Sequence, residues 1–483
     1  MKEPSLTTPP APATGRPRLS GSARWLRLFL GVSLLGGPLL AGSPAAPEPI
    51  LTAPLSLPDA VNLAFSRNAT VLRARKDLES TEGLIVQTRA IAVPKLVVSG
   101  NFKAVQPSDI DIVSFPAGSG LPTGLTFGVD KTWATGVELV QSLYEGGRIA
   151  SSFRTARLSR AQALLNYQTA LSDVILLVEL AYYDVLLAQQ QITVREASVD
   201  LLTHELADTT RRYDAGTVPR FNVLRAEVEL ANARPKLIRA RNSFRIAKNN
   251  LVNLMGFNLP RETSEDIPLT LAGKLEAQPY TISLPDALQA ALGRRTELQA
   301  LRKAQALRNE DVITAKAGSK PSVQAYAGYE VHNSALHADV GYEIHGWVAG
   351  VGLNWNVFDG MATRGRVRQA LAGLDRAAID LDDTARRIEL EVRTAFSNFI
   401  EAGEVNESEK KVIEQAEEAL RLARSRYEAG AGTQLDVLSA QTALTDARTT
   451  SVEALHDYSA ARARLERATG ALTAGAAGTP PSQ

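Results

Sequence analysis

A helical repeat of apolar residues dominates the chain between Arg148 and Tyr213. This segment contains neither proline nor glycine, and at 1.5 Å per residue an uninterrupted helix of this length would extend about 100 Å. Its apolar positions recur with the alternating spacing of four and three that a coiled-coil seam requires. The seam, with a few polar interruptions, runs through Leu164, Gln168, Leu171, Ile175, Val178, Tyr182, Val185, Gln189, Ile192, Glu196 and Val199.

The second half of the chain carries a matching segment from about Thr363 to Tyr427. Each of the two segments ends at a glycine, Gly216 or Gly430, where the chain can make a tight turn. A return helix then follows, to about Met255 in the first half and about Ala468 in the second. The pattern therefore predicts two antiparallel helical hairpins.

Between the helices, four segments of about 9 to 12 residues alternate apolar with polar side chains, the period of a β-strand. They lie within residues 98–104, 133–144, 323–330 and 347–357. A tilted strand needs about this length to cross the hydrocarbon core, and alternation is typical of a barrel wall between lipid and water.

Trp133, Trp347 and Trp355 all fall in these four segments, as expected for aromatic side chains at the membrane interfaces. Four strands cannot close a barrel, and a sheet that spans a membrane cannot keep an open edge. Several protomers must then share one barrel, and three would supply twelve strands. The alternative is a soluble β-sandwich flank with an aromatic core.

An internal duplication organises the chain. The hexapeptide that starts at Leu55 recurs at Ile282, 227 residues later, with one conservative change. The stretch from Tyr213 to Arg234 aligns with that from Tyr427 to Arg448, at an offset of 214, with nine identities in 22 positions. Chance similarity between two helices would preserve apolar spacing but not the shared glycine and tyrosine. The offset changes between 94 and 145, so we expect an insertion-tolerant loop there.

The duplication defines the expected domains. A first structural repeat covers 55–270, a second covers 282–470, and a tail at 471–483, rich in Ala, Gly and Pro, is expected to be disordered. Each repeat opens with a helix start, because Ser56 or Ser283 can cap the first turn and a proline follows where its missing N–H costs nothing.

The first 46 residues resemble a signal peptide, with arginines followed by an apolar run and then small residues. An uncleaved anchor is the alternative. Cleavage would change the formal net charge from +1 to −3, which gives no reason to expect nucleic acid as a partner. The chain has no cysteine, which excludes disulfides, Cys-ligated zinc, thiol catalysis and lipid attachment to cysteine.

Several motifs in order resemble the TolC-like outer-membrane efflux proteins. These are the Ser-Leu-Pro-Asp-Ala openings, the strand end from Gln141 to Arg148 with its counterpart from Asn354 to Gly360, and the two Arg-Tyr-x-Ala-Gly tips. The resemblance covers roughly 55–470. It implies a mainly α fold with a small β part: a homotrimer with a shared twelve-stranded transmembrane β-barrel in the outer membrane of a Gram-negative bacterium and a periplasmic α-helical tunnel.

The resemblance also implies a function and a gate. The trimer would conduct substrates passively from an inner-membrane pump of the RND, ABC or MFS type, through a periplasmic adaptor protein, to the outside. The tips would form the periplasmic gate and dock the adaptor, with the residues Tyr213, Gly216, Asn222, Tyr427, Gly430 and Asp436. Three Asp436 carboxylates in a ring would favour cations, although an ordinary aspartate at a helix N-terminus is the alternative. A basic gate partner is missing, because Gly432 stands at its position.

No catalytic motif is present, and we expect no enzyme activity, cofactor or metal. His332, His337 and His345 are expected to be exposed loop residues, with a metal sensor as the alternative. His204 and His456 are expected on helix surfaces. An exported structural coiled-coil protein without channel activity is the competing function. Drug efflux, metal-ion efflux and protein secretion all remain open as the transport role.

Overall fold

The computed structural model describes residues 54–106, 108, 110–113, 125–127, 129–258, 267–334 and 341–472. The chain divides into two units, and the first, residues 1–49, lies wholly outside this described part. The expected signal peptide, 1–46, therefore stays a prediction. The expected tail, 471–483, also lies outside it apart from residues 471 and 472.

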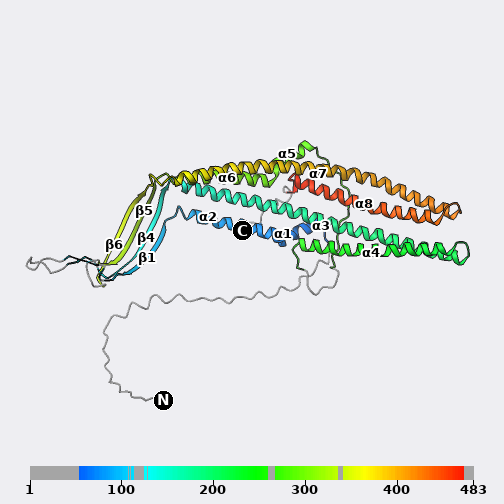
Figure 1. Cartoon of the computed structure of the whole chain (residues 1–483), viewed down its shortest axis with the longest axis horizontal. Coiled ribbons are helices and arrows are strands. Elements are labelled where there is room, and N and C mark those ends of the chain that lie inside the picture. The colour runs from blue at the N-terminus through cyan, green and yellow to red at the C-terminus, as the bar shows by residue number, and fades with distance from the viewer. Residues whose placement is uncertain are drawn as a thin grey trace, which may run out of the picture. The chain divides into compact units, whose positions relative to one another are not determined.

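The second unit repeats one series of elements, in which two helices, a pair of long strands, a very long helix and a return helix follow one another (Figure 1). The first copy contains α1 (Leu57–Arg67), α2 (Ala69–Arg89), α3 (Arg148–Asp214) and α4 (Arg220–Leu254). The second contains α5 (Leu284–Arg294), α6 (Thr296–Ala317), α7 (Ala362–Glu428) and α8 (Gln434–Ala468). Both long helices have 67 residues and both return helices have 35, which confirms the duplication and the two hairpins.

Four antiparallel strands form one sheet in the order β1-β4-β5-β6. These are β1 (Lys95–Ala104), β4 (Lys131–Glu145), β5 (Ser322–Asn333) and β6 (Glu343–Asn354). Two further strands, β2 (Asp111–Val113) and β3 (Leu125–Phe127), pair with each other in the interval that was expected to be a loop. Strands of three residues are too short to produce a detectable period of two, so the sequence pattern did not predict them.

The duplication extends to the strand register. Lys95 pairs with Val140 where β1 meets β4, and Ser322 pairs with Asn354 where β5 meets β6. Ser322 lies 227 residues after Lys95, and Asn354 lies 214 residues after Val140. The two pairs are therefore equivalent under the offsets of the repeat, and the sheet consists of two copies of one strand pair.

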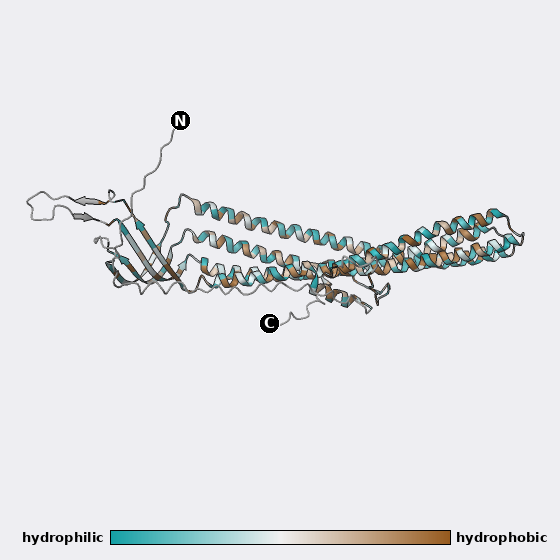
Figure 2. Ribbon diagram, turned by 90° about the horizontal axis from the view of Figure 1, so that it is seen from below, coloured by the Kyte–Doolittle hydropathy of each residue, from teal (hydrophilic) through white to brown (hydrophobic). Residues whose placement is uncertain are grey.

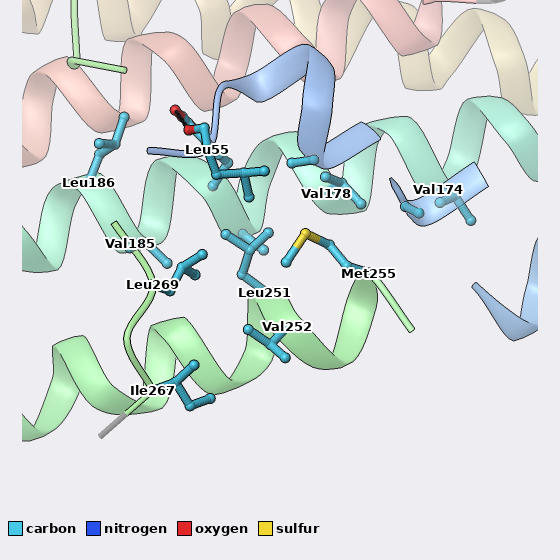
Figure 3. Close-up of a cluster of buried hydrophobic side chains, with 14 of the residues drawn as sticks. Leu55, Val174, Val178, Val185, Leu186, Leu251, Val252, Met255, Ile267 and Leu269 are labelled. Carbon is cyan, nitrogen blue, oxygen red and sulfur yellow. Dashed lines mark hydrogen bonds between the residues drawn. The ribbon is translucent and has the colours of Figure 1, made fainter. Parts of the chain in front are cut away.

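The predicted helix seam is buried in its middle section, where α3 packs against α4 and the start of the first copy (Figure 3). Val178, Tyr182 and Val185 of α3 are almost fully buried, together with Leu251 and Met255 at the end of α4. Such packing supplies the stability of a helix that would be marginal in isolation. A related cluster joins α5 to α7, so the short first helix of each copy packs on the long helix of the same copy.

The expected helix starts are confirmed at both openings. The Ser56 hydroxyl accepts a hydrogen bond from the backbone N–H of Asp59 at 3.3 Å, and Ser283 accepts one from Asp286 at the same distance. A proline occupies the first turn in each case. The identical caps show that the two copies begin in the same local conformation.

A network of two buried arginines links the second copy to α3 of the first through Arg467. Arg467 of α8 is 7% exposed, and its guanidinium lies 2.6 Å from carboxylate oxygens of both Asp173 on α3 and Glu297 on α6. Arg295 pairs with Glu297 and with Glu391 of α7. Burial opposes ionisation of Glu297, but the two arginines outweigh it and hold the pKa of its carboxyl group below its ordinary value. The charges are paired, as burial requires.

We predict that Arg467→Met lowers the free energy of unfolding by roughly 2–3 kcal/mol, because Asp173 loses the arginine that it pairs with and the partly buried Glu297 keeps only Arg295. Denaturant unfolding of the purified protein measures the change. Arg464→Met is the matched control, since Arg464 lies on the same helix but is exposed. Equal losses in the two variants would contradict a stabilising role for the buried network.

Candidate functional site

The register of the sheet places most of its large apolar side chains on one face. Val98 of β1 pairs with Val137 of β4, which pairs with Tyr329 of β5, which pairs with Trp347 of β6. Alternate positions along each strand share that face, which therefore also carries Leu96, Phe102, Trp133, Leu139, Val323, Ala325, Ala327, Ala349, Val351 and Leu353. The opposite face carries Ser99, Asn101, Glu138, Gln324 and Glu330 among its polar residues.

No layer from the described part of the chain covers these apolar side chains. Val98 is 72% exposed, Trp347 81% and Leu353 69%, and the helices extend from one end of the sheet without covering a face (Figures 1 and 2). A soluble sandwich would bury this face under a second sheet or helices. An apolar face without cover, on strands of 10 to 15 residues, has the dimensions of a wall in a bilayer.

Both edges of the sheet are open. β1 has a strand partner only on its β4 side, and β6 only on its β5 side, among the described residues. β1 is exposed along its whole length, and β6 along nearly all of it. Each edge therefore offers a row of backbone N–H and C=O groups for pairing with another strand.

The three tryptophans occupy different levels of the sheet. Trp133 pairs with Phe102 near the end far from the helices, and Trp347 pairs with Tyr329 further along. Trp355 was expected inside the fourth strand, but β6 ends at Asn354, and that expectation was wrong. The Trp355 indole donates a hydrogen bond to the Ser319 carbonyl at 3.1 Å, which holds the ring at the base of the sheet. Their role as interface aromatics stays a prediction.

The two hairpin tips share one backbone conformation at the end remote from the sheet (Figure 1). Gly216 and Gly430 have φ angles of +71° and +73°. The N–H of Gly216 donates to the Tyr213 carbonyl, and the N–H of Thr217 donates to the Arg212 carbonyl. The same pair of bonds recurs at Tyr427 in the second hairpin. This is the Schellman arrangement, in which glycine adopts the left-handed conformation without strain.

The two return helices begin differently. In the second tip, Asp436 and Thr433 form a capping box: the Asp436 carboxylate accepts from the Thr433 N–H at 2.9 Å, and the Thr433 hydroxyl accepts from the Asp436 N–H at 3.2 Å. The Thr433 N–H and the Thr433 hydroxyl, which donates to the same carboxylate at 2.8 Å, lower the pKa of the Asp436 carboxyl group, and the charge of Arg426 adds to the effect. In the first tip Pro219 caps the helix without a side-chain bond, and Asn222 has no charge.

Asp436 therefore caps the N-terminus of α8, which is the ordinary role that the sequence left open as the alternative to a gate residue. The side chain is nevertheless exposed, so an ionised carboxylate also stands at the surface of the tip. Gly432 contributes no basic group there, and an added Cβ would lie only 3.2 Å from atoms of Arg426 and Tyr427. Arg426 is the neighbouring cation.

A buried polar layer joins the hairpins just behind the tips. Gln434 of α8 is 4% exposed, and its amide donates to the hydroxyl of Thr209 on α3 at 2.9 Å. The Arg212 guanidinium lies 5.0 Å from the centre of the Tyr427 ring. The Tyr427 hydroxyl is buried without a hydrogen-bond partner in the described part of the chain, whereas Tyr213 is 42% exposed. The two tip tyrosines are therefore not equivalent.

Sequence reasoning missed Thr209, Gln434 and Arg212 as members of this layer. Thr209 and Gln434 lie on different hairpins, 225 residues apart, and no local pattern shows that they meet. The sequence held a partial signal, because Gln434 is a polar residue that shares a helix face with Val437 and Leu438. The contact between Gln434 and Thr209 becomes apparent only when α8 is seen packed on α3.

The expectation for the histidines is confirmed at His204, whose side chain is 77% exposed. His332 lies on β5 and is only partly exposed, and His345 is exposed but lies on β6, beside Tyr329. The expectation of loop positions was therefore wrong for these two, and His337 lies outside the described residues. His456 was expected on a surface and this was wrong: its side chain is only 13% exposed and contacts Asp184 of α3 and Asp457 of α8.

Within the described ranges, no group of three or more histidine, aspartate, glutamate or cysteine residues is arranged to hold a metal ion. None of the described helices combines the length and apolar character needed to span a membrane.

Comparison with curated proteins finds relatives along most of the chain. It is 25% identical over 425 residues to the alkaline protease secretion protein AprF of Pseudomonas aeruginosa, covering 86% of this chain and 85% of AprF. It is 28% identical over 410 residues to the cobalt-zinc-cadmium resistance protein CzcC of Cupriavidus metallidurans, covering 82% and 85%. The outer membrane protein TolC of Vibrio cholerae is 26% identical over 345 residues, with coverage of 70% and 77%.

Solved structures share the fold. The outer membrane protein VceC of Vibrio cholerae superposes with a TM-score of 0.68 at 19% identity, covering 86% of this chain and 96% of VceC. The open MtrE outer membrane channel of Neisseria gonorrhoeae gives 0.67 at 18% identity, with coverage of 86% and 88%. The model of the outer membrane efflux protein family matches residues 60–257 and 287–471. The chain therefore belongs to the outer membrane efflux protein family, as a channel protein of the Gram-negative outer membrane whose long helices extend into the periplasm.

Proposed function

We propose that three copies of the chain form one passive exit duct, with a shared twelve-stranded barrel in the outer membrane and a helical tunnel below it. The open edges at β1 and β6 carry this proposal. A sheet in lipid must pair all its backbone groups, and four strands cannot do so within one chain. Pairing β6 of each copy with β1 of the next satisfies both edges.

The internal duplication supplies the register of that missing pairing. β5 is the repeat equivalent of β1, and β4 is the equivalent of β6. Glu138 of β4 pairs with Gly328 of β5, and the offsets of 214 and 227 convert this pair to Gly352 and Asn101. We therefore place Gly352 of one protomer opposite Asn101 of its neighbour, with both on the polar face of the sheet.

Our proposal for the periplasmic end is that the six hairpin tips form the gate and contact an adaptor protein of an inner-membrane pump. Gly216 and Gly430 support it, because neither glycine has a neighbouring atom within 4 Å of an added Cβ, so the turn surface is open to a partner. The exposed Asp436 carboxylates would form a ring of negative charge around the three-fold axis. Relatives of similar identity are named for protease secretion and for metal resistance, so we assign the choice of cargo to the pump.

The absence of cysteine permits a direct test of the shared barrel. We predict that Asn101→Cys combined with Gly352→Cys links protomers under mild oxidation, because directly opposed Cβ atoms lie about 4.5–5.5 Å apart. An added Cβ at 352 meets only one atom, at 4.0 Å, so the substitution fits. Denaturing electrophoresis should show dimers and trimers and nothing larger.

The matched control pairs Asn101→Cys with Gly346→Cys. Gly346 is on the same face of β6, and an added Cβ there also lies in open space. Six residues along a strand correspond to roughly 20 Å, so this pair should give only monomers. Equal linking in both pairs, or a ladder beyond three chains, would refute the three-fold barrel.

For the gate, we predict that Asp436→Asn reduces the preference of the channel for cations. The reversal potential across a planar bilayer under a salt gradient measures this preference. Because hydrogen bonds from Thr433 lower the pKa of the Asp436 carboxyl group, the carboxylate stays ionised below the ordinary aspartate value of about 3.9. Cation preference in the unsubstituted channel should therefore persist as the pH falls to about 4.

The variant Thr433→Ala distinguishes the role of Asp436 in the ring of carboxylates from its role in the helix cap. This variant loses the threonine hydroxyl of the capping box but keeps the carboxylate, so it should lower the melting temperature and retain cation preference. If Asp436→Asn shifts the melting temperature alone and leaves the reversal potential unchanged, the carboxylate is only a cap.

A further inference from the structure

Polar pairs connect α3 to α8 along almost the whole length of α8. The two helices lie side by side and antiparallel. The pairs, from the end nearest the sheet to the tip, are Asp173–Arg467, Asp184–His456, Gln191–Glu453, Ser198–Thr445 and Thr209–Gln434. Leu438 of α8 adds one apolar contact with Leu202 of α3. The seam between the two hairpins is thus mainly polar.

The seam within the second hairpin is different. Leu420 of α7 packs with Val437 and Leu444 of α8 in an apolar cluster near the tip, and Phe399 of α7 packs with Tyr458 and Leu465 nearer the sheet. Apolar seams of this kind hold α7 and α8 together. Separation of the hairpins would therefore occur along the α3–α8 seam, where mainly hydrogen bonds and ion pairs must break.

His456 is the member of this seam whose charge changes near neutral pH. Its Nε2 lies 2.9 Å from an Asp184 carboxylate oxygen, and its Nδ1 lies 2.9 Å from one of Asp457. Burial opposes protonation of the ring, but the hydrogen bonds and charges of the two aspartates outweigh it and raise the pKa above the ordinary histidine value. In the described part of the chain, Asp184 and Asp457 are the charged groups that face the ring. Glu453 lies one turn away on α8, but its carboxylate accepts a hydrogen bond from Gln191 instead.

We propose that His456 is a pH-sensitive clasp that tightens the contact of the second hairpin with α3 when it is protonated and loosens that contact when it is neutral. Protonated, both ring nitrogens donate to carboxylates, one on each helix. Neutral, the ring keeps only one N–H, so one carboxylate faces a nitrogen lone pair. A raised folded-state pKa means that the clasp is complete below the ordinary histidine pKa of about 6.5 and is lost as the pH rises through the raised value.

The clasp can be tested by measuring the distance between the hairpins in the full-length protein. Ala197 of α3 and Ala443 of α8 are exposed, and cysteines at both positions accept spin labels on this cysteine-free chain. Trimers diluted with unlabelled protein report the distance within one chain by pulsed electron paramagnetic resonance. The expected result is a single short distance at pH 5.5 and a longer or broader distribution at pH 9.

Substitution identifies the titrating group. His456→Gln should give the broad distribution at both pH values, and Asp184→Asn should weaken the pH dependence even if the first variant folds poorly. His204→Gln is the control, because this histidine is exposed and pairs with Asp200 on its own helix; it should behave like the parent protein. An unchanged distance across the pH range in the parent protein, or an equal pH response in His456→Gln, would overturn the proposal.

Conductance measurements show whether the clasp also controls opening of the proposed channel. The proposal that the clasp acts on opening rests on the proposed function, whereas the distance measurement does not. Single-channel recording at the two pH values should show more frequent opening at pH 9 in the parent protein and no such change in His456→Gln. A pH-dependent distance without pH-dependent opening would sustain the clasp and contradict its link to the gate.

Discussion

The requirement that every backbone N–H and C=O group in a bilayer has a hydrogen-bond partner governs the rest of this structure. A single chain supplies four strands to the sheet, and the outer edges of β1 and β6 have no strand partner among its described residues. Those edges can be satisfied only by other chains. The sharing of strands then fixes a rotational symmetry, which aligns the long helices of different copies around one axis. The tunnel is therefore a consequence of how the sheet must be closed.

A different constraint applies to the long helices. Each extends about 100 Å with 67 residues, and no helix of that length is stable in water without a partner along its apolar side. Short helices such as α1 and α5 cover the middle of α3 and α7, and the return helices cover the half toward the tips. Apolar contacts thus concentrate within each hairpin, while polar pairs accumulate between hairpins. That division allows rigid hairpins to move relative to one another.

Periodicity predicted the helices and the sheet well, because both depend on local spacing of apolar residues. It failed where a tertiary contact decides the outcome. Trp355 continues the alternation of apolar and polar residues in β6, but the strand ends at Asn354. The Trp355 indole instead donates a hydrogen bond to the Ser319 carbonyl, outside the sheet. An isolated histidine on a helix suggests a surface position, but Asp184, which approaches His456, is 272 residues distant. The capping box at Asp436 was readable as an alternative because it involves residues three apart.

Divergence between the two copies gives the α3–α8 seam its particular chemistry. The offset of 214 places Asn242 of α4 at the position of His456 and Asn398 of α7 at the position of Asp184. In the proposed trimer, α4 of one chain would lie against α7 of its neighbour, as α8 lies against α3 within the chain. That second seam has two uncharged amides at this level, so its strength cannot change with protonation there. A pH-dependent clasp would consequently act three times per trimer, always within one chain, and would loosen the contact of α8 with α3 while the contact between chains is kept.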